Sequence, residues 1–173
     1  MQRHNKKISI YLTAVFCLLF SVSIFAQADA VKQLKQEINE KNKSITAGDP
    51  WTIENVITVD ELTSLLKKQG SKEVYIFQVG YNSLYSQGHI KGALYAGPAS
   101  KEEGLLKLES SIKDLPRNKE IILYCGCCNW IDCPNIRPAF ETAHKMGFKN
   151  VKVLYLPDNF TVDWMNKGLP VEK

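Results

Sequence analysis

The sequence lacks the excess of basic residues that binding to a polyanion requires. Its formal net charge at pH 7 is +4, but three of its 22 basic residues lie among the first 28 residues, which contain no aspartate or glutamate. The rest of the chain has 19 basic residues against 18 acidic ones. This nearly neutral balance gives nucleic acid or an anionic membrane surface no electrostatic attraction, and we expect neither as a partner.

The sequence also contains no internal repeat and no low-complexity tract. Of its 173 residues, 45% are hydrophobic and 23% are charged, which is typical of a single compact domain with a buried core. Collagen, a coiled coil and extensive disorder are therefore excluded.

Cysteine is absent from most of the chain. Of five cysteines, Cys17 lies alone near the N-terminus, and the other four, Cys125, Cys127, Cys128 and Cys133, lie within nine residues. A disulfide framework places its cysteines along the whole chain, because it links distant segments. The clustered cysteines therefore indicate a functional site rather than structural crosslinks.

The N-terminus has the layout of a secretory signal peptide. Residues 1–7 are cationic, residues 8–26 are almost continuously apolar, and Ala26 and Ala28 supply the small residues before a cleavage site. We predict a signal peptide at 1–28, export to the periplasm or secretion, and no stable membrane insertion after cleavage. The alternative is an uncleaved anchor, because an apolar run of this length can just span a bilayer.

The remaining chain divides into an N-terminal helix and linker at 29–52 and a domain at 53–173, in which strand and helix signals alternate. The predicted strands are 55–58, 74–79, 92–96, 121–124 and 151–156. The first predicted helix begins at a capping box at Thr58 and ends at Gly70. Two further helices are predicted at 102–113 and 138–146, followed by a last helical turn around Trp164. Strand 121–124 is wholly apolar, so we expect it to be buried on both faces. The pattern predicts an α/β fold with a central parallel sheet and helices on both faces.

Cys125 is the first residue after strand 121–124 and begins a loop that runs to the helix at Pro138. In parallel α/β sheets, ligands bind at the carboxyl ends of the strands, where helix N-termini converge. Inward-turned amides and the partial positive charge of the helix favour a thiolate there. Because only the thiolate is a nucleophile, we expect Cys125 to act as a nucleophilic acceptor of sulfur or of an oxyanion.

Four segments resemble the successive motifs of the rhodanese-like sulfurtransferase domain. In chain order they are Gly88-His89-Ile90-Lys91-Gly92-Ala93, Tyr124-Cys125, Gly147-Phe148-Lys149-Asn150-Val151, and Trp164 with Gly168-Leu169-Pro170-Val171-Glu172. The resemblance covers residues 53–172. It implies a rhodanese-like fold in which Cys125 takes sulfane sulfur from a small donor such as thiosulfate or a persulfide, becomes a persulfide itself, and passes the sulfur to a thiol or other thiophilic acceptor. It implies no metal and no organic cofactor.

The loop after Cys125 departs from the pattern of this family. The family usually has an arginine five positions after the cysteine, whereas the first arginine here is Arg137, twelve positions after Cys125. The loop that surrounds the sulfur must therefore have a different shape in this protein. The family also often has an aspartate and an arginine where this chain has Gln78-Val79-Gly80. We expect Gly126, Asn129, Trp130 and Arg137 to bind the substrate. For Arg137 the reason is a guanidinium beside a helix N-terminus, which attracts an anionic donor.

Cys127, Cys128 and Cys133 are predicted to act with Cys125 as resolving or relay thiols. Cys125 and Cys128 form a C-x-x-C pair suited to a reversible disulfide, with an exported redox protein as a possible partner. All four cysteines are also candidate ligands of zinc or copper(I), which defines an alternative function as a thiol redox or soft-metal module on the same fold. A catalytically silent interaction domain is a third alternative, because a fold alone does not establish activity.

Histidine offers little support for a Cys-His protease. His144 lies two turns along the helix that follows the loop, too far from Cys125 to act as its base. The resemblance to the rhodanese-like family places His89 in a tight turn, and we expect it to be structural.

Overall fold

The computed structural model describes residues 29, 32–33, 35–38, 40, 49–69 and 74–173. The chain forms two units, residues 1–43 and 44–173. In the first unit, the described residues between 29 and 40 are helical. The predicted signal peptide at 1–28 and the linker residues 41–48 lie outside the described residues. Within the described ranges, no helix is long and apolar enough to cross a membrane.

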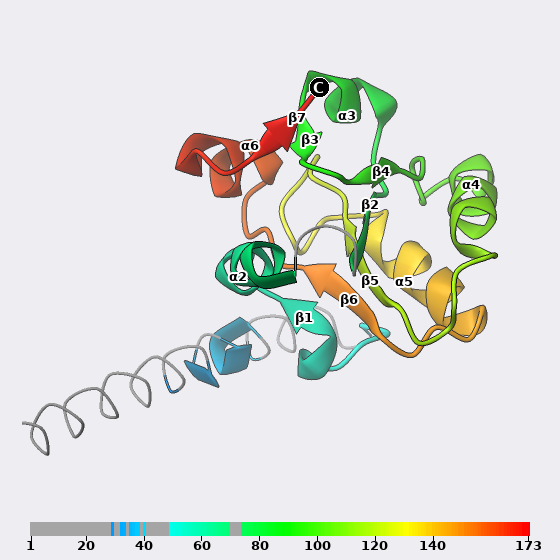
Figure 1. The fold of residues 1–173 in the computed structure, drawn as a ribbon, viewed down its shortest axis with the longest axis horizontal. Coiled ribbons are helices and arrows are strands. Elements are labelled where there is room, and N and C mark those ends of the chain that lie inside the picture. The colour runs from blue at the N-terminus through cyan, green and yellow to red at the C-terminus, as the bar shows by residue number, and fades with distance from the viewer. Residues whose placement is uncertain (1–28, 30–31, 34, 39, 41–48, 70–73) are drawn as a thin grey trace, which may run out of the picture. The chain divides into compact units, whose positions relative to one another are not determined.

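The second unit is built on a parallel sheet of five strands in the order β1-β6-β5-β2-β4 (Figure 1). These strands are β1 (Val56–Ile57), β2 (Val74–Gln78), β4 (Leu94–Tyr95), β5 (Glu120–Tyr124) and β6 (Val151–Leu154). Every neighbouring pair is parallel, and β5 is the central strand between β6 and β2. The predicted central parallel sheet is confirmed.

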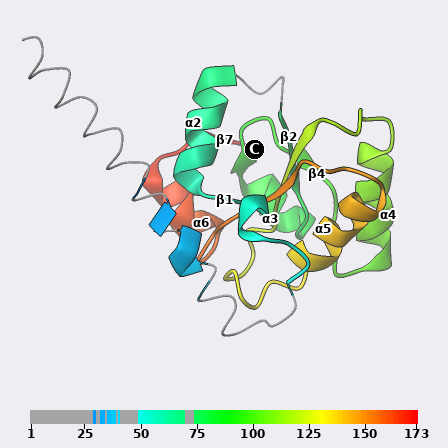
Figure 2. The same cartoon turned by 90° about the horizontal axis from the view of Figure 1, so that it is seen from below.

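Helices cover both faces of this sheet, as predicted. One face carries α2 (Val59–Gln69) and the short α6 (Phe160–Asp163), and the other carries α4 (Glu102–Ile112) and α5 (Ile136–Lys145), as Figures 1 and 2 show. Side chains alternate between the faces along a strand. Ile122 of β5 therefore packs in one cluster with Leu62 and Trp164. Ile121 and Leu123, which point to the opposite face, are also fully buried.

The N-termini of helices α2 and α5 lie at or near the positions that the sequence predicts. At α2 the predicted capping box is present, because Thr58 N donates to Glu61 Oε2 at 2.9 Å and Glu61 N donates to Thr58 Oγ1 at 3.2 Å. Helix α5 begins at Ile136, two residues before the predicted start at Pro138. A proline is accepted in the first turn, where N–H groups have no intrahelical acceptor. The loop after Cys125 is correspondingly shorter, and Asn135 becomes the N-cap residue of α5.

Three small elements do not follow from the sequence. Helix α3 (Asn82–Gln87) follows β2, and β3 (His89–Ile90) pairs antiparallel with β7 (Val171–Glu172). Each is too short to show a periodic hydrophobic pattern. The β3–β7 pair places the first and the last of the four sequence motifs side by side (Figure 1).

Candidate active site

Cys125 lies at the carboxyl end of the central strand, where the sequence predicts it. Strand β5 ends at Tyr124, and the Cys125 side chain that follows is buried. The loop returns to the same region at Asn135, where α5 begins. The Cys125 sulfur therefore lies between a strand end and a helix N-terminus, the two features that favour an anionic or polarised group in a parallel sheet.

Three sulfur atoms meet at this point. Cys125 Sγ lies 3.0 Å from Cys127 Sγ, and Cys127 Sγ lies 3.1 Å from Cys128 Sγ. The three sulfurs all lie within 4.8 Å of one another, and we call Cys125, Cys127 and Cys128 the sulfur cluster. The structure brings three of the four predicted cysteines together in this cluster, but the sulfur in contact with Cys125 belongs to Cys127 rather than to the C-x-x-C partner Cys128.

Hydrogen bonds between these thiols redistribute their protons. Bonding to Cys127 raises the pKa of the Cys125 thiol above its ordinary value, and bonding to Cys133 and burial act in the same direction. The same contacts lower the pKa of Cys127, with Cys125 the largest contributor and Cys133 the next. Burial raises the pKa of Cys128. These contacts therefore place the lower pKa of the pair on Cys127 and the higher one on Cys125.

Asn135 is the polar side chain that faces this cluster from α5. It is fully buried, and its Nδ2 donates to Cys125 Sγ at 3.2 Å and to Cys127 Sγ at 3.9 Å. Its Oδ1 accepts a hydrogen bond from Ser100 N at 2.9 Å. The bond from Ser100 fixes the orientation of the amide, so the NH₂ group rather than the oxygen faces the sulfurs.

Gln78 and Gly80 hold the other side of Cys125. Gln78 is buried at the end of β2, and its Nε2 donates to Cys125 O at 2.9 Å while its Oε1 accepts from Gly80 N at 3.2 Å. A Cβ atom at Gly80 would lie 2.7 Å from Cys125 O and 3.2 Å from Cys125 Sγ. This position therefore requires glycine, because any larger residue displaces the Cys125 backbone.

The loop residues predicted to bind substrate have mainly structural contacts. Asn129 makes two hydrogen bonds to Asp132 within the loop, and Gly126 O accepts from Phe160 N at 3.3 Å. Trp130 is buried and packs edge-on against Trp51 and Tyr155, with ring centroids 5.5 and 5.2 Å apart. Of this group, Gly126 lines the pocket described below.

Arg137 stabilises the end of the loop that follows Cys125. Its Nε forms an ion pair with Asp49 Oδ1 at 2.7 Å, and its Nη1 donates to Ile131 O and Cys133 O at 3.4 and 3.2 Å. The guanidinium also lies 5.6 Å from the ring centroid of Trp51. The structure thus gives Arg137 partners within the protein, and its role in donor binding stays a prediction.

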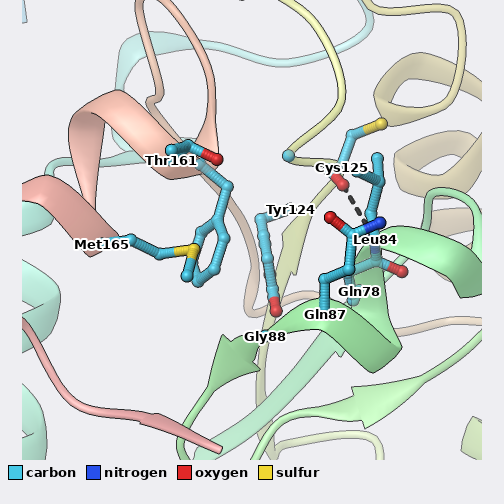
Figure 3. Close-up of a pocket in the computed structure, with 10 residues that line it drawn as sticks. Gln78, Leu84, Gln87, Gly88, Tyr124, Cys125, Thr161 and Met165 are labelled. Atoms are coloured by element: carbon cyan, nitrogen blue, oxygen red, sulfur yellow. Dashed lines mark hydrogen bonds between the residues drawn. The ribbon is translucent and has the colours of Figure 1, made fainter. Parts of the chain in front are cut away.

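A pocket of about 370 Å³ lies beside Cys125 between the α3 and α6 segments (Figure 3). It is lined by Gln78, Leu84, Gln87, Gly88, Tyr124, Cys125, Gly126, Phe160, Thr161 and Met165. None of these lining side chains is a carboxylate, an ammonium or a guanidinium. Figure 3 shows the Cys125 side chain pointing away from Tyr124 and Met165, so its sulfur faces the loop.

Comparisons with known proteins agree with this fold. The rhodanese-like domain family matches residues 58–156, which is more than half of the chain, and the protein belongs to this family. No curated protein matches the sequence.

Solved structures share the fold at low sequence identity. The BH2092 protein from Bacillus halodurans is 20% identical, with 84% of this chain and 85% of that chain covered and a TM-score of 0.52. The Alr3790 protein from Anabaena sp. is 22% identical, with 67% and 81% covered and a TM-score of 0.51. The single-domain sulfurtransferase RDL2 from Saccharomyces cerevisiae is 20% identical, with 71% and 94% covered and a TM-score of 0.50.

The sequence analysis missed two site residues, Gln78 and Asn135. Gln78 could have been found as the polar residue that ends an otherwise apolar strand. Asn135 could have been found as an N-cap residue next to a cysteine-rich loop, although its side chain caps no helix N–H and instead faces sulfur. His89 has a structural environment, since it is buried, stacks on Tyr85 and bonds to Tyr85 O at 3.0 Å.

Proposed function

We propose that the protein is a sulfurtransferase that carries sulfane sulfur as a persulfide on Cys125 and passes it to a thiol or another thiophilic acceptor. Membership of the rhodanese-like family supports this chemistry in general. The assignment to Cys125 is supported by the position of its sulfur, which lies at the end of the central strand, 3.0 Å from the Cys127 sulfur.

The nucleophile is the thiolate of Cys125, so this thiol must lose its proton before it attacks the donor. Asn135 Nδ2 donates to Cys125 Sγ and stabilises the new charge, because hydrogen bonds to a charged acceptor are stronger than bonds to a neutral one. The raised pKa of Cys125 makes its thiolate more nucleophilic once formed, since nucleophilicity rises with basicity.

The first transfer forms one S–S bond and breaks another. The Cys125 thiolate attacks the outer sulfur of the donor, and the electron pair of the donor's S–S bond leaves with sulfite from thiosulfate or with a thiolate from an organic persulfide. Cys125 then carries the persulfide. In the second transfer, an acceptor thiolate attacks the outer sulfur and releases the Cys125 thiolate.

A resolving reaction is available when no acceptor arrives. The Cys127 thiolate attacks Cys125 Sγ, hydrosulfide leaves, and a Cys125–Cys127 disulfide forms. The contact between these two sulfurs supports Cys127 for this role. A dithiol reductant, for which an exported redox protein is our candidate, then restores both thiols.

The uncharged pocket favours an organic persulfide over thiosulfate as the preferred donor. Its lining offers amide groups from Gln78 and Gln87 and apolar surface from Leu84, Phe160 and Met165, but no cation to pair with a sulfonate oxygen. We further propose that the Cys125 sulfur turns toward this pocket by rotation about its Cα–Cβ bond to meet the donor, and that the protein acts after export.

Persulfide labelling of serine variants tests this function. Cys125→Ser should abolish labelling by both donors, because a hydroxyl neither holds sulfane sulfur nor ionises at neutral pH. Cys128→Ser and Cys133→Ser should keep the first half-reaction. Cys127→Ser should keep the first half-reaction and lose the hydrosulfide that the resolving step releases. Full labelling of Cys125→Ser would exclude Cys125 as the carrier, and unreactive thiols throughout would indicate a silent interaction domain.

A further inference from the structure

The sulfur cluster has the size of a metal site. A zinc–thiolate bond of about 2.3 Å places the ligand sulfurs of a trigonal or tetrahedral site roughly 4 Å apart. The three cluster sulfurs already lie within 4.8 Å of one another, with two contacts of 3.0 and 3.1 Å. The two short contacts need to lengthen by only about 1 Å to reach the spacing of metal ligands.

A small void lies next to two residues of the sulfur cluster, Cys125 and Cys128. Its volume is about 10 Å³, and its lining includes Cys125, Cys128 and Cys133 together with Trp130, Ile136 and Leu156. This is close to the minimum space for one water molecule, and it is too small for thiosulfate. Besides the cysteines, its lining has two side chains with polar groups, Asn129, which bonds to Asp132, and Trp130, whose buried Nε1 has no hydrogen-bond partner among the described residues.

Disulfide formation does not account for the whole cluster. Adjacent residues have Cα atoms about 3.8 Å apart, which is below the usual range of about 4.4 to 6.8 Å for a disulfide. The Cys127–Cys128 contact is therefore poorly suited to a disulfide, although it is nearly as short as the Cys125–Cys127 contact. One cation bound to all three sulfurs accounts for both short contacts.

Asn135 supplies the outer support that thiolate sites usually have. Its NH₂ group donates to two of the sulfurs, Cys125 at 3.2 Å and Cys127 at 3.9 Å, and the bond from Ser100 N holds it in place. Hydrogen bonds from buried residues orient ligands and stabilise the negative charge that three thiolates bring. A buried amide aimed at two sulfurs is thus a feature of the site independent of the sulfur spacing.

We propose that Cys125, Cys127 and Cys128 bind one thiophilic d¹⁰ cation, copper(I) or zinc(II), with Cys133 next to the site as a fourth ligand for a tetrahedral ion. This inference goes beyond the proposed function. Because the cation and the sulfane sulfur both need Cys125, the metal-bound protein cannot carry a persulfide. Metal binding therefore switches sulfur transfer off.

The test is metal titration of the reduced, metal-free full chain with copper(I) and with zinc(II), each against a competing chromophoric chelator. The wild-type protein should bind one equivalent of at least one of the two ions and show thiolate-to-copper absorption or metal–sulfur distances in X-ray absorption. Cys127→Ser and Cys128→Ser should each weaken binding by at least about tenfold. Met146→Leu removes a sulfur remote from the cluster, at the end of α5, and should bind as the wild type does.

The outcomes separate this inference from the proposed function. Binding of neither ion, or equal affinity in the wild type and in both serine variants, would overturn the metal site even if Cys125 forms a persulfide. Stoichiometric binding that Cys127→Ser and Cys128→Ser both weaken would establish the site even if no persulfide forms. Loss of binding in the wild type after persulfide loading would confirm that the two ligands compete for Cys125.

Discussion

Asn135 donates a hydrogen bond to the Cys125 sulfur at 3.2 Å while its oxygen accepts one from Ser100 N at 2.9 Å. The first bond favours the thiolate form of Cys125, and the second fixes the direction of the first. Asn135 is fully buried at the N-cap position of α5, but its side chain caps no helix N–H. Its amide therefore serves the Cys125 sulfur rather than the helix.

Asn135→Asp should slow persulfide formation on Cys125 by about tenfold to a hundredfold. A carboxylate keeps an acceptor for Ser100 N but removes the N–H donor, and a hydrogen bond to a charged group contributes about 1.5 to 3 kcal/mol. The measurement is the rate of labelling by an organic persulfide. Asn150→Asp is the matched control, because Asn150 bonds to Asn118 O on the surface. Equal rates in the two variants would show that Asn135 does not act on the sulfur.

Gly80→Ala should destabilise the protein by about 1 to 3 kcal/mol and reduce sulfur transfer. The added Cβ would lie 2.7 Å from Cys125 O, and overpacking of this size in a buried site has that typical cost. The unfolding free energy in urea and the labelling rate measure the two effects. Gly168→Ala is the control, since its Cβ meets no atom within 4 Å and only its φ of 67° adds strain. Wild-type labelling by Gly80→Ala would contradict the contact with Cys125.

Arg137→Ala should lower the unfolding free energy by about 1 to 3 kcal/mol, because it leaves the mostly buried Asp49 carboxylate unpaired. It should also slow transfer from thiosulfate and from an organic persulfide by similar factors, because Arg137 holds the loop through Ile131 O and Cys133 O. Asp49→Asn is the partner variant for a double-mutant cycle. A loss confined to thiosulfate would instead establish Arg137 as a binding residue for anionic donors.

Alkylation of Cys127 should depend weakly on pH. A free cysteine has a pKa of about 8.5, so its alkylation rate falls about tenfold for each pH unit below that value. The lowered pKa of Cys127 keeps it a thiolate throughout, so its rate with iodoacetamide should stay nearly constant between about pH 6 and 8. Cys125→Ala removes the largest contributor to the low pKa and should make the rate rise with pH. Peptide mapping identifies the modified residue, and a tenfold slope in the wild type would contradict the proton arrangement.

The sequence predicts the sheet well because the signals that build it are long or chemically distinct. The apolar strand at Ile121–Tyr124, the capping box at Thr58 and the cysteine that follows the central strand all depend on local pattern, and the structure confirms these features. The β3–β7 pair was missed because each strand has two residues, and its pairing joins segments far apart in the chain.

The interior of the site was less accessible to sequence reasoning. Spacing along the chain favours the C-x-x-C pair, but the loop turns so that Cys127 lies between Cys125 and Cys128. Trp130 packs into the interior with Trp51, a contact that requires the chain before the domain's first strand to fold against the loop. Which side chains face the sulfur is decided by tertiary contacts such as Ser100 with Asn135, and no local pattern encodes them.

The most direct test of Cys125 as the sulfur carrier is the intact mass of the reduced, metal-free protein after incubation with an organic persulfide, followed by fragmentation to locate the added mass. The protein should gain one sulfur atom, located on Cys125, and lose it again when a thiol acceptor is added. A gain located on Cys127, Cys128 or Cys133, or no gain while the four thiols remain reduced, would contradict sulfur transfer through Cys125.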